Sequence, residues 1–175
     1  MKSIKEYAFE NRKPIDISPL KASYLNDKDY EMAHKSLVIV THDILIEYQK
    51  GFLLVLRNKV PEKGEYWPIG GRINRGMPLL ESIHKKVKEE SGLDVDNIVP
   101  IGYRRTFFAT DPFCHGKGTD TLNLGFYAKG TGTLQLDSLH LNHIIITKEM
   151  FTPELKKTLH PCVLDLLEEG FKLIC

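Results

Sequence analysis

The sequence contains little cysteine, no long apolar run and almost no net charge. Its three cysteines, Cys114, Cys162 and Cys175, form no CxxC pair, which argues against a zinc ribbon and favours reduced thiols. No apolar stretch approaches the roughly 20 residues of a membrane helix, and the opening "MKSIKEYAFENRK" lacks the apolar segment of a signal peptide. A net charge of +1 gives no electrostatic argument for nucleic-acid binding. We therefore expect a cytoplasmic protein without membrane or nucleic-acid partners.

The remaining composition is typical of one globular domain. Hydrophobic residues make up 42% of the 175 residues and charged residues 27%, enough for a single core of ordinary size. Residues 1–24 are polar and contain Pro14 and Pro19, so we interpret them as an N-terminal arm. The domain itself is then expected to span residues 25–175.

Strand patterns and helix patterns alternate along this domain. The helix that follows Pro78 is expected to end at Gly92, because proline suits the first turn of a helix and glycine its end. The other segments predict helices at "NDKDYEMAH" and at residues 153–169, and strands within "SLVIVTHDILIEY", "FLLVLR", "IVPIGYRRTFF", "TLNLGFYAKG" and "IIIT". This alternation, with hairpins, predicts an α/β fold with a mixed sheet.

The helix after Pro78 carries a carboxylate on its apolar side. At 100° per residue, Ile83 and Val87 fall on the same stripe as Leu80, and Glu90 lies in the middle of that stripe. Its neighbour Glu89 points away from the stripe. A carboxylate that faces a core is costly unless it is paired or bound to a metal ion, so Glu90 requires a partner.

Two kinds of partner are open for Glu90. Lys86, one turn earlier, would form an ion pair with it, although lysine followed by glutamate is the less favourable order. Gly70 and Gly71, before the helix, allow a close approach of the backbone and offer carbonyls to a cation. Arg72, which follows them, offers a guanidinium to a phosphate. Together these residues favour a site for a metal and a phosphate.

The stretch "GGRINRGMPLLESIHKKVKEESGL" resembles the Nudix signature, G-x5-E-x7-R-E-U-x-E-E-x-G-U, in which U is aliphatic. The match opens at Gly71 and is fixed by the closing "EESGL". Met77 replaces the first glutamate, Lys85 replaces the arginine, and Lys86 replaces the glutamate that follows the arginine. In the family, that last glutamate helps to hold the metal ions that activate water for attack on phosphorus. The resemblance thus implies altered chemistry at this site.

From about Leu25 almost to its end, the chain resembles the GDP-mannose mannosyl hydrolase branch of this superfamily, which lacks the same glutamate and cuts at the sugar carbon. The resemblance implies the Nudix fold, a mixed β-sheet sandwiched between α-helices. "HDILIEYQKGFLLVLRN" is similar to the first hairpin of the branch, which implies base recognition by Asp43 and phosphate contact by Arg57. "DSLHLNH" resembles its catalytic loop, which implies that His140 is the base; His143 is the rival.

The resemblance also implies one Mg²⁺, or Mn²⁺ in its place. Its expected ligands are Glu90, the Gly70 carbonyl and Glu89, while Arg72 would stabilise charge on the departing diphosphate. The family has a metal-binding glutamine where this chain has Leu139. The branch pairs through its N-terminal region, which implies a homodimer.

We therefore expect a Mg²⁺-dependent hydrolase of nucleoside diphosphate sugars, such as GDP-mannose, that releases free sugar and nucleoside diphosphate. A first alternative is a Nudix pyrophosphohydrolase that cuts between phosphates, with the missing glutamate supplied by Glu62 or Glu65. A second alternative is a non-catalytic domain that binds a nucleotide sugar, which the departures at Met77, Lys86 and Leu139 favour.

Overall fold

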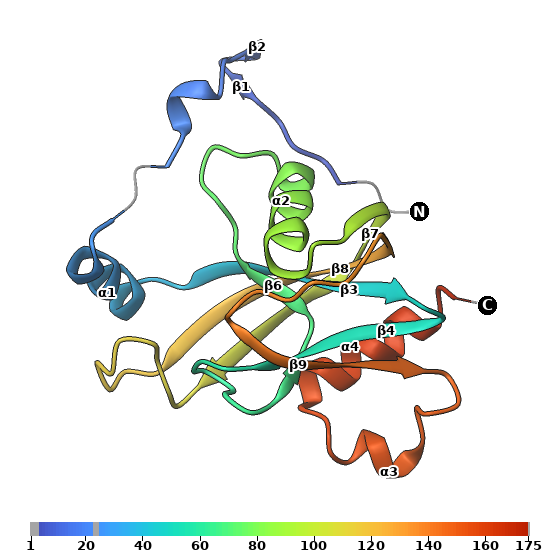
Figure 1. The fold of residues 1–175 in the computed structure, drawn as a ribbon. Helices are drawn as coiled ribbons and strands as arrows, with labels where there is room; N and C mark the ends of the chain where they lie inside the picture. The colour runs from blue at the N-terminus through green and yellow to red at the C-terminus, as the bar shows by residue number, and fades with distance from the viewer. Residues whose placement is uncertain (1–3, 23–24, 175) are drawn as a thin grey trace.

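The computed structural model describes residues 4–22 and 25–174 (Figure 1). Its strands are β1 (Phe9–Glu10), β2 (Lys13–Pro14), β3 (Ile39–Tyr48), β4 (Gly51–Arg57), β5 (Tyr66–Trp67), β6 (Ile69–Arg72), β7 (Asp94–Phe108), β8 (Thr119–Thr131) and β9 (His140–Thr147). Its helices are the 3₁₀ helix η1 (Ser18–Leu20) and the α-helices α1 (Asp27–Ser36), α2 (Leu79–Ser91), α3 (Pro153–Lys156) and α4 (Pro161–Phe171).

A mixed sheet forms the centre of the domain. Within the described residues it contains seven strands, in the order β5-β4-β3-β8-β7, with β6 added to β3 and β9 added to β4. Strands β3 and β8 run parallel, whereas β4 and β6 pair with β3 in antiparallel fashion. The expected α/β class with a mixed sheet is therefore confirmed.

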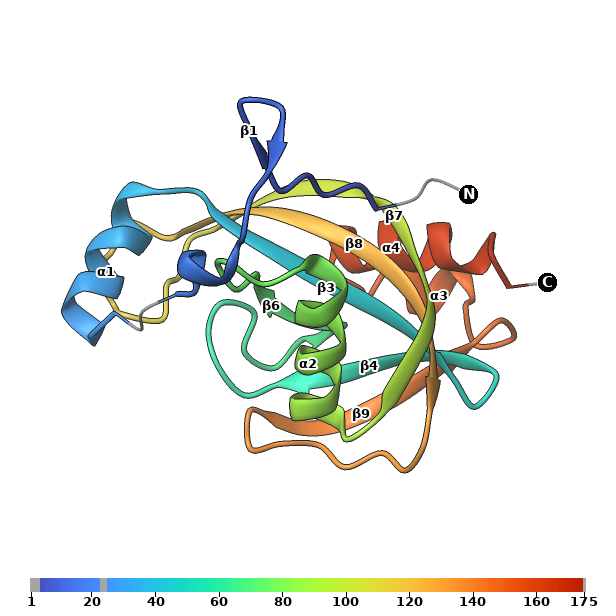
Figure 2. The ribbon, with the colours of Figure 1, turned by 90° about the horizontal axis from the view of Figure 1, so that it is seen from above.

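Helices cover both faces of this sheet, as Figures 1 and 2 show for α2 on one side and α4 on the other. Ile44 and Ile46 of β3 pack in one core cluster with Val87 of α2. Leu45 points to the opposite face and packs in a second cluster with Leu166 of α4. Because both faces are covered, the middle of β3 is apolar without alternation. The expected sandwich of helices around a sheet is confirmed.

The apolar stripe predicted for α2 faces the sheet from its second turn onward. Ile83 and Val87 are fully buried, and Glu90 keeps only 5% of its surface accessible, whereas Leu80 in the first turn is exposed. The helix ends at Gly92, which adopts the left-handed conformation with φ of 70°. The burial predicted for Glu90 is thus confirmed.

The C-terminal segment predicted to be helical, residues 153–169, is helical with one interruption that the sequence analysis did not predict. It forms α3 and α4, with Pro161 in the first turn of the second helix. Proline cannot donate the backbone hydrogen bond that a helix interior requires, but it fits a first turn. His160 caps α4, because its Nδ1 accepts the backbone N–H of Cys162 at 3.1 Å.

The N-terminal arm contacts the segment that leads into α2. Arg75 Nη1 donates to the Leu20 carbonyl at 2.7 Å. The carboxylate of Glu6 accepts the backbone N–H of Leu79 at 3.0 and 3.2 Å. Pro78, at the N-cap position, makes no side-chain cap, so Glu6 supplies the negative charge that the start of a helix favours. The arm therefore holds the start of the helix that carries Glu90.

The structure also bears on the cysteines and on membrane-spanning helices. Cys114 and Cys162 are both free thiols, and Cys175 lies outside the described residues. Across residues 4–22 and 25–174, we find no helix with the length and apolarity needed to cross a membrane.

Candidate active site

The glycine pair of β6 lies directly against β3. Gly70 stands opposite Asp43, and Gly71 stands opposite His42. A Cβ atom on Gly70 would collide with the His42 carbonyl and the Asp43 carboxylate, so no larger residue fits there. His42 also ties β3 to α2, because its Nε2 lies 2.9 Å from Ser82 Oγ. These contacts hold the glycine pair, β3 and α2 together.

Three side chains that the sequence analysis singled out meet at the end of α2. Lys86 Nζ donates to Glu90 Oε1 at 3.1 Å, so the ion pair considered for Glu90 is present. On the other side, His140 Nε2 lies 3.9 Å from Glu90 Oε2, which is longer than a hydrogen bond. Burial raises the pKa of Glu90 above its usual value, and the ammonium of Lys86 opposes this effect. Glu90 thus lies between a lysine and a histidine.

His140 is the first residue of β9, so its prediction as a loop residue was wrong. Its partner is Asp137, whose Oδ1 lies 2.8 Å from His140 Nδ1. The backbone N–H of Asp137 donates to the Glu90 carbonyl at 3.2 Å, which attaches this turn to α2. Sequence reasoning missed Asp137, although an aspartate three residues before a histidine is a recognisable signal. His143, the rival base, is exposed and stands opposite Val55 of β4.

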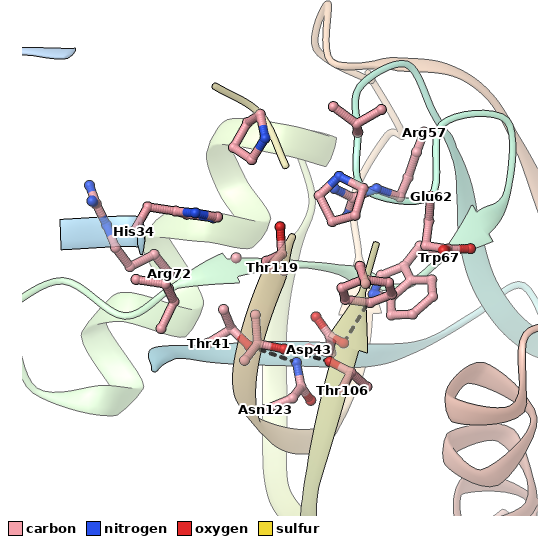
Figure 3. Close-up of a pocket in the computed structure, with 18 of the residues that line it drawn as sticks. His34, Thr41, Asp43, Arg57, Glu62, Trp67, Arg72, Thr106, Thr119 and Asn123 are labelled. Atoms are coloured by element: carbon pink, nitrogen blue, oxygen red, sulfur yellow. Dashed lines mark hydrogen bonds between the residues drawn. The ribbon is translucent and has the colours of Figure 1, made fainter. Parts of the chain in front are cut away.

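A cavity of about 220 Å³ opens beside β3 and β6 (Figure 3). Asp43 is buried in its wall and accepts a hydrogen bond from Trp67 Nε1 at 3.0 Å. Burial raises the pKa of Asp43 to about 7. Asn123 donates to Thr41 Oγ1 at 3.0 Å, and its Oδ1 is buried with no partner among the described residues. The cavity wall therefore offers buried oxygen atoms to a ligand.

Arg57 lies between this cavity and the Glu90 cluster. It lines the cavity and stands opposite His140 in the pairing of β4 with β9. Burial lowers the pKa of Arg57, while the carboxylates of Asp43 and Glu90 oppose that shift. Its Nε is buried without a partner in the described part of the chain. A guanidinium in this position is available to an anion in the cavity.

Arg72 lines the cavity at its opposite end, away from Arg57 and Trp67 (Figure 3). Its guanidinium lies over the ring of Tyr30, 4.3 Å from the ring centroid, in a cation–π contact. Because Arg72 is otherwise exposed, it also remains available to an anion.

Glu89, an expected metal ligand, lies on the exposed side of α2. Its side chain keeps 56% of its surface accessible, and the nearest cation is Lys85 Nζ at 3.9 Å. Of the two adjacent glutamates, the structure therefore places only Glu90 near His140.

Met77, which replaces the first glutamate of the signature, lies in the loop before α2. Asn74 Nδ2 approaches its sulfur at 3.9 Å.

Glu90 is the carboxylate at this end of α2 that has an oxygen free for a cation. No group of three or more His, Cys, Asp or Glu side chains within the described residues is arranged to hold a metal ion. Glu90 Oε2 accepts no hydrogen bond from the described residues, and the neighbouring Gly71 packs against Lys86, which brings the β6 backbone close. Mg²⁺ commonly binds one or two carboxylates and completes its shell with water and substrate phosphates. The free Oε2 of Glu90 supplies one such carboxylate oxygen.

Comparison with known sequences gives a partial similarity. No family model matches the chain. The chain is 27% identical over 84 residues to the low-salt glycan biosynthesis protein Agl8 of Haloferax volcanii. The match covers 48% of this chain and 54% of that protein, so it spans about half the length of this curated relative.

Solved structures resemble the whole domain. The MutT Nudix hydrolase of Burkholderia pseudomallei has a TM-score of 0.62 at 16% identity, covering 77% of this chain and 98% of its own. A Nudix-family hydrolase from Clostridium perfringens has a TM-score of 0.62 at 18% identity, covering 79% and 99%. The Nudix domain of Shewanella oneidensis NrtR, complexed with ADP ribose, has a TM-score of 0.60 at 15% identity, covering 86% and 100%. The chain therefore has the Nudix fold.

Proposed function

We propose that this protein hydrolyses nucleoside diphosphate sugars with Mg²⁺, releasing free sugar and nucleoside diphosphate. The main support is His140, which lies beside Glu90 and is oriented by Asp137. At the same site, Lys86 occupies the position of a second acidic residue of the family. The resemblance to GDP-mannose mannosyl hydrolases supports the substrate class. The structural neighbour crystallised with ADP ribose, an ADP-linked sugar, is consistent with it.

His140 has the geometry of a general base. The Asp137 carboxylate only accepts hydrogen bonds, so it keeps the proton of neutral His140 on Nδ1 and leaves the lone pair of Nε2 free. Nε2 removes a proton from water as the water oxygen bonds to the anomeric carbon. The bond from that carbon to the phosphate oxygen breaks, and its electron pair stays on the diphosphate.

The departing diphosphate requires positive charge around it. Arg57 and Arg72 line the two ends of the cavity and would neutralise part of its charge. A bound Mg²⁺, held by Glu90 and the Gly70 carbonyl, would supply further charge to the leaving group. Lys86 holds the Glu90 carboxylate in place through its 3.1 Å contact. We assign the metal role to Glu90 in preference to Glu89, whose side chain faces solvent.

The alternative cleavage between phosphates needs another carboxylate near Glu90. Of the two glutamates that could supply it, Glu62 lines the cavity on the Arg57 side and Glu65 is exposed, and neither is paired with Lys86 or His140 in the described part of the chain. Attack on carbon has no such requirement, since the water needs one base and the diphosphate is already a good leaving group. The position of Glu62 and Glu65 therefore favours attack at the sugar.

A panel of nucleoside diphosphate sugars with Mg²⁺, analysed by chromatography of the products, tests this proposal. We expect free sugar plus nucleoside diphosphate, and no turnover when the metal is chelated. Sugar 1-phosphate plus nucleoside monophosphate would establish the pyrophosphohydrolase alternative. Tight binding of the panel without any turnover would establish a binding domain.

We also propose that the protein is a homodimer that pairs through its N-terminal region. Support comes from the family resemblance and from Tyr7 and Phe9 of the arm, which expose 77% and 56% of their surface in the single chain. Apolar side chains exposed on an arm are suited to burial against a second copy. Sedimentation analysis is expected to give the dimer mass, and a monomer mass at all concentrations would remove the proposal.

A further inference from the structure

A second cluster of polar side chains lies at the cavity, away from Glu90. His34 of α1 and His115 of the loop between β7 and β8 are far apart in sequence, yet His34 Nδ1 lies 2.9 Å from His115 Nε2. Tyr30 and Phe113 pack edge-on against the His34 ring. No spacing pattern links these two histidines, and the proposed hydrolysis gives them no role.

Asp111 fixes the position of His115. Its carboxylate accepts the backbone N–H groups of Phe113, His115 and Gly116 at 3.0, 3.0 and 3.1 Å, which closes the loop around it. Burial alone would raise the pKa of Asp111, but these backbone donors outweigh burial and lower it. The His115 side chain is completely buried against this carboxylate. The histidine is therefore held by the backbone of its own loop.

The hydrogen bonds around His115 determine where both histidines carry their protons. The backbone N–H of Lys117 donates to His115 Nδ1 at 3.0 Å, and a backbone amide can only donate. Nδ1 is therefore an acceptor, although Asp111 Oδ2 lies 3.3 Å away. Neutral His115 then carries its proton on Nε2 and donates it to His34 Nδ1. Consequently, His34 carries its own proton on Nε2.

The remaining N–H of His34 is available to a ligand. His34 lines the cavity, is 7% exposed, and makes no hydrogen bond through Nε2 to residues 4–22 or 25–174. Burial, followed by the neighbouring His115, lowers the pKa of His34, which keeps the ring neutral. Figure 3 shows His34 beside Arg72, at the end of the cavity opposite Arg57 and Trp67.

We propose that His34, held by His115 and Asp111, is a fixed neutral donor to a phosphate oxygen of the bound nucleoside diphosphate. A phosphate oxygen only accepts hydrogen bonds, which matches an N–H that cannot turn into an acceptor. Arg72 at the same end supplies the charge that such a group requires. The identity of this ligand rests on the function proposed above, whereas the proton positions do not.

Histidine ¹⁵N NMR of the ligand-free protein tests the proton positions independently of activity. We expect His34 to be neutral at pH 7.5, and the neutral rings of both His34 and His115 to carry the proton on Nε2. A proton on Nδ1 of His34, or a doubly protonated His34 ring, would overturn the proposal whatever the protein hydrolyses.

Calorimetric titration with inorganic pyrophosphate and Mg²⁺ tests the ligand. A hydrogen bond to a charged oxygen is worth about 1.5–3 kcal/mol, so His34→Phe should bind pyrophosphate roughly 10- to 100-fold more weakly. His34→Gln keeps a donor near the place of Nε2 and should recover most of that loss. His84→Phe, which changes an exposed histidine of α2, should bind as the wild type does.

Two results of this titration would contradict the inference. One is wild-type affinity in His34→Phe, and the other is a wild-type protein that does not bind pyrophosphate at all. A third result would separate the two proposals: the wild type binds pyrophosphate, His34→Phe binds it more weakly, and no nucleotide sugar is turned over. In that case the inference about His34 stands and the proposed hydrolysis fails. The two proposals are therefore separable.

Discussion

Glu90→Gln is expected to lose essentially all turnover while the protein remains folded. The amide keeps the shape of the buried side chain but removes the charge that would bind Mg²⁺. We expect a stability cost of about 1–3 kcal/mol, because a buried partner is lost but the Lys86 side chain still reaches solvent. The measurement is turnover of a nucleoside diphosphate sugar together with the shift of melting temperature on adding Mg²⁺. Both should disappear in the variant.

Lys86→Met provides the matched control for this variant. It breaks the same ion pair from the other side and leaves the Glu90 carboxylate present. If Glu90 binds the metal, Lys86→Met should keep the Mg²⁺-dependent melting shift that Glu90→Gln loses. If the pair has only a structural role, both variants should lose similar stability and both should retain turnover. Normal turnover in Glu90→Gln would remove the metal assignment.

His140→Gln is expected to lower kcat by about 10² to 10⁴, the range typical of losing a general base. KM should change little, since the lost interaction belongs to the transition state. The acidic limb of the kcat profile reports protonation of the base, so it should flatten in this variant. The measurement is kcat and KM between pH 5 and 9 with a saturating metal concentration.

Two further variants separate His140 from its neighbours. His143→Gln should change both kinetic parameters only modestly, because His143 is exposed on β9. Asp137→Asn should lower kcat by less than His140→Gln does, since the base remains but its proton position is no longer fixed. An unchanged acidic limb in His140→Gln would transfer the role of the base to His143 or to a carboxylate.

The sequence predicted the parts of the fold that depend on local periodicity. The burial of Glu90 followed from its place on the stripe of Ile83 and Val87, because the helical repeat alone sets that direction. The break between α3 and α4 was missed, although Pro161 carried the signal for it. The start of β9 at His140 depends on pairing with β4, which is a long-range contact that local residues do not determine.

The site was predictable only where residues lie close in sequence or match a motif. Lys86 and Glu90 are one helical turn apart, so their contact could be expected. The spacing of Asp137 and His140 makes their contact possible, but a short loop can direct its side chains in many ways, so the spacing alone does not predict it. The contact of His34 with His115 joins residues 81 positions apart and arises only when α1 meets the loop after β7. The contact between two residues so far apart in sequence cannot be predicted from their spacing.

We propose that water attacks the sugar carbon and not a phosphorus atom. It follows from a base at His140, oriented by Asp137, and from Lys86 at the place of a family metal ligand. Hydrolysis in ¹⁸O-labelled water, followed at once by mass spectrometry of the nucleotide product, tests it most directly. We predict a nucleoside diphosphate free of ¹⁸O, with the label in the released sugar. Any ¹⁸O incorporated into a phosphate group during turnover would contradict it.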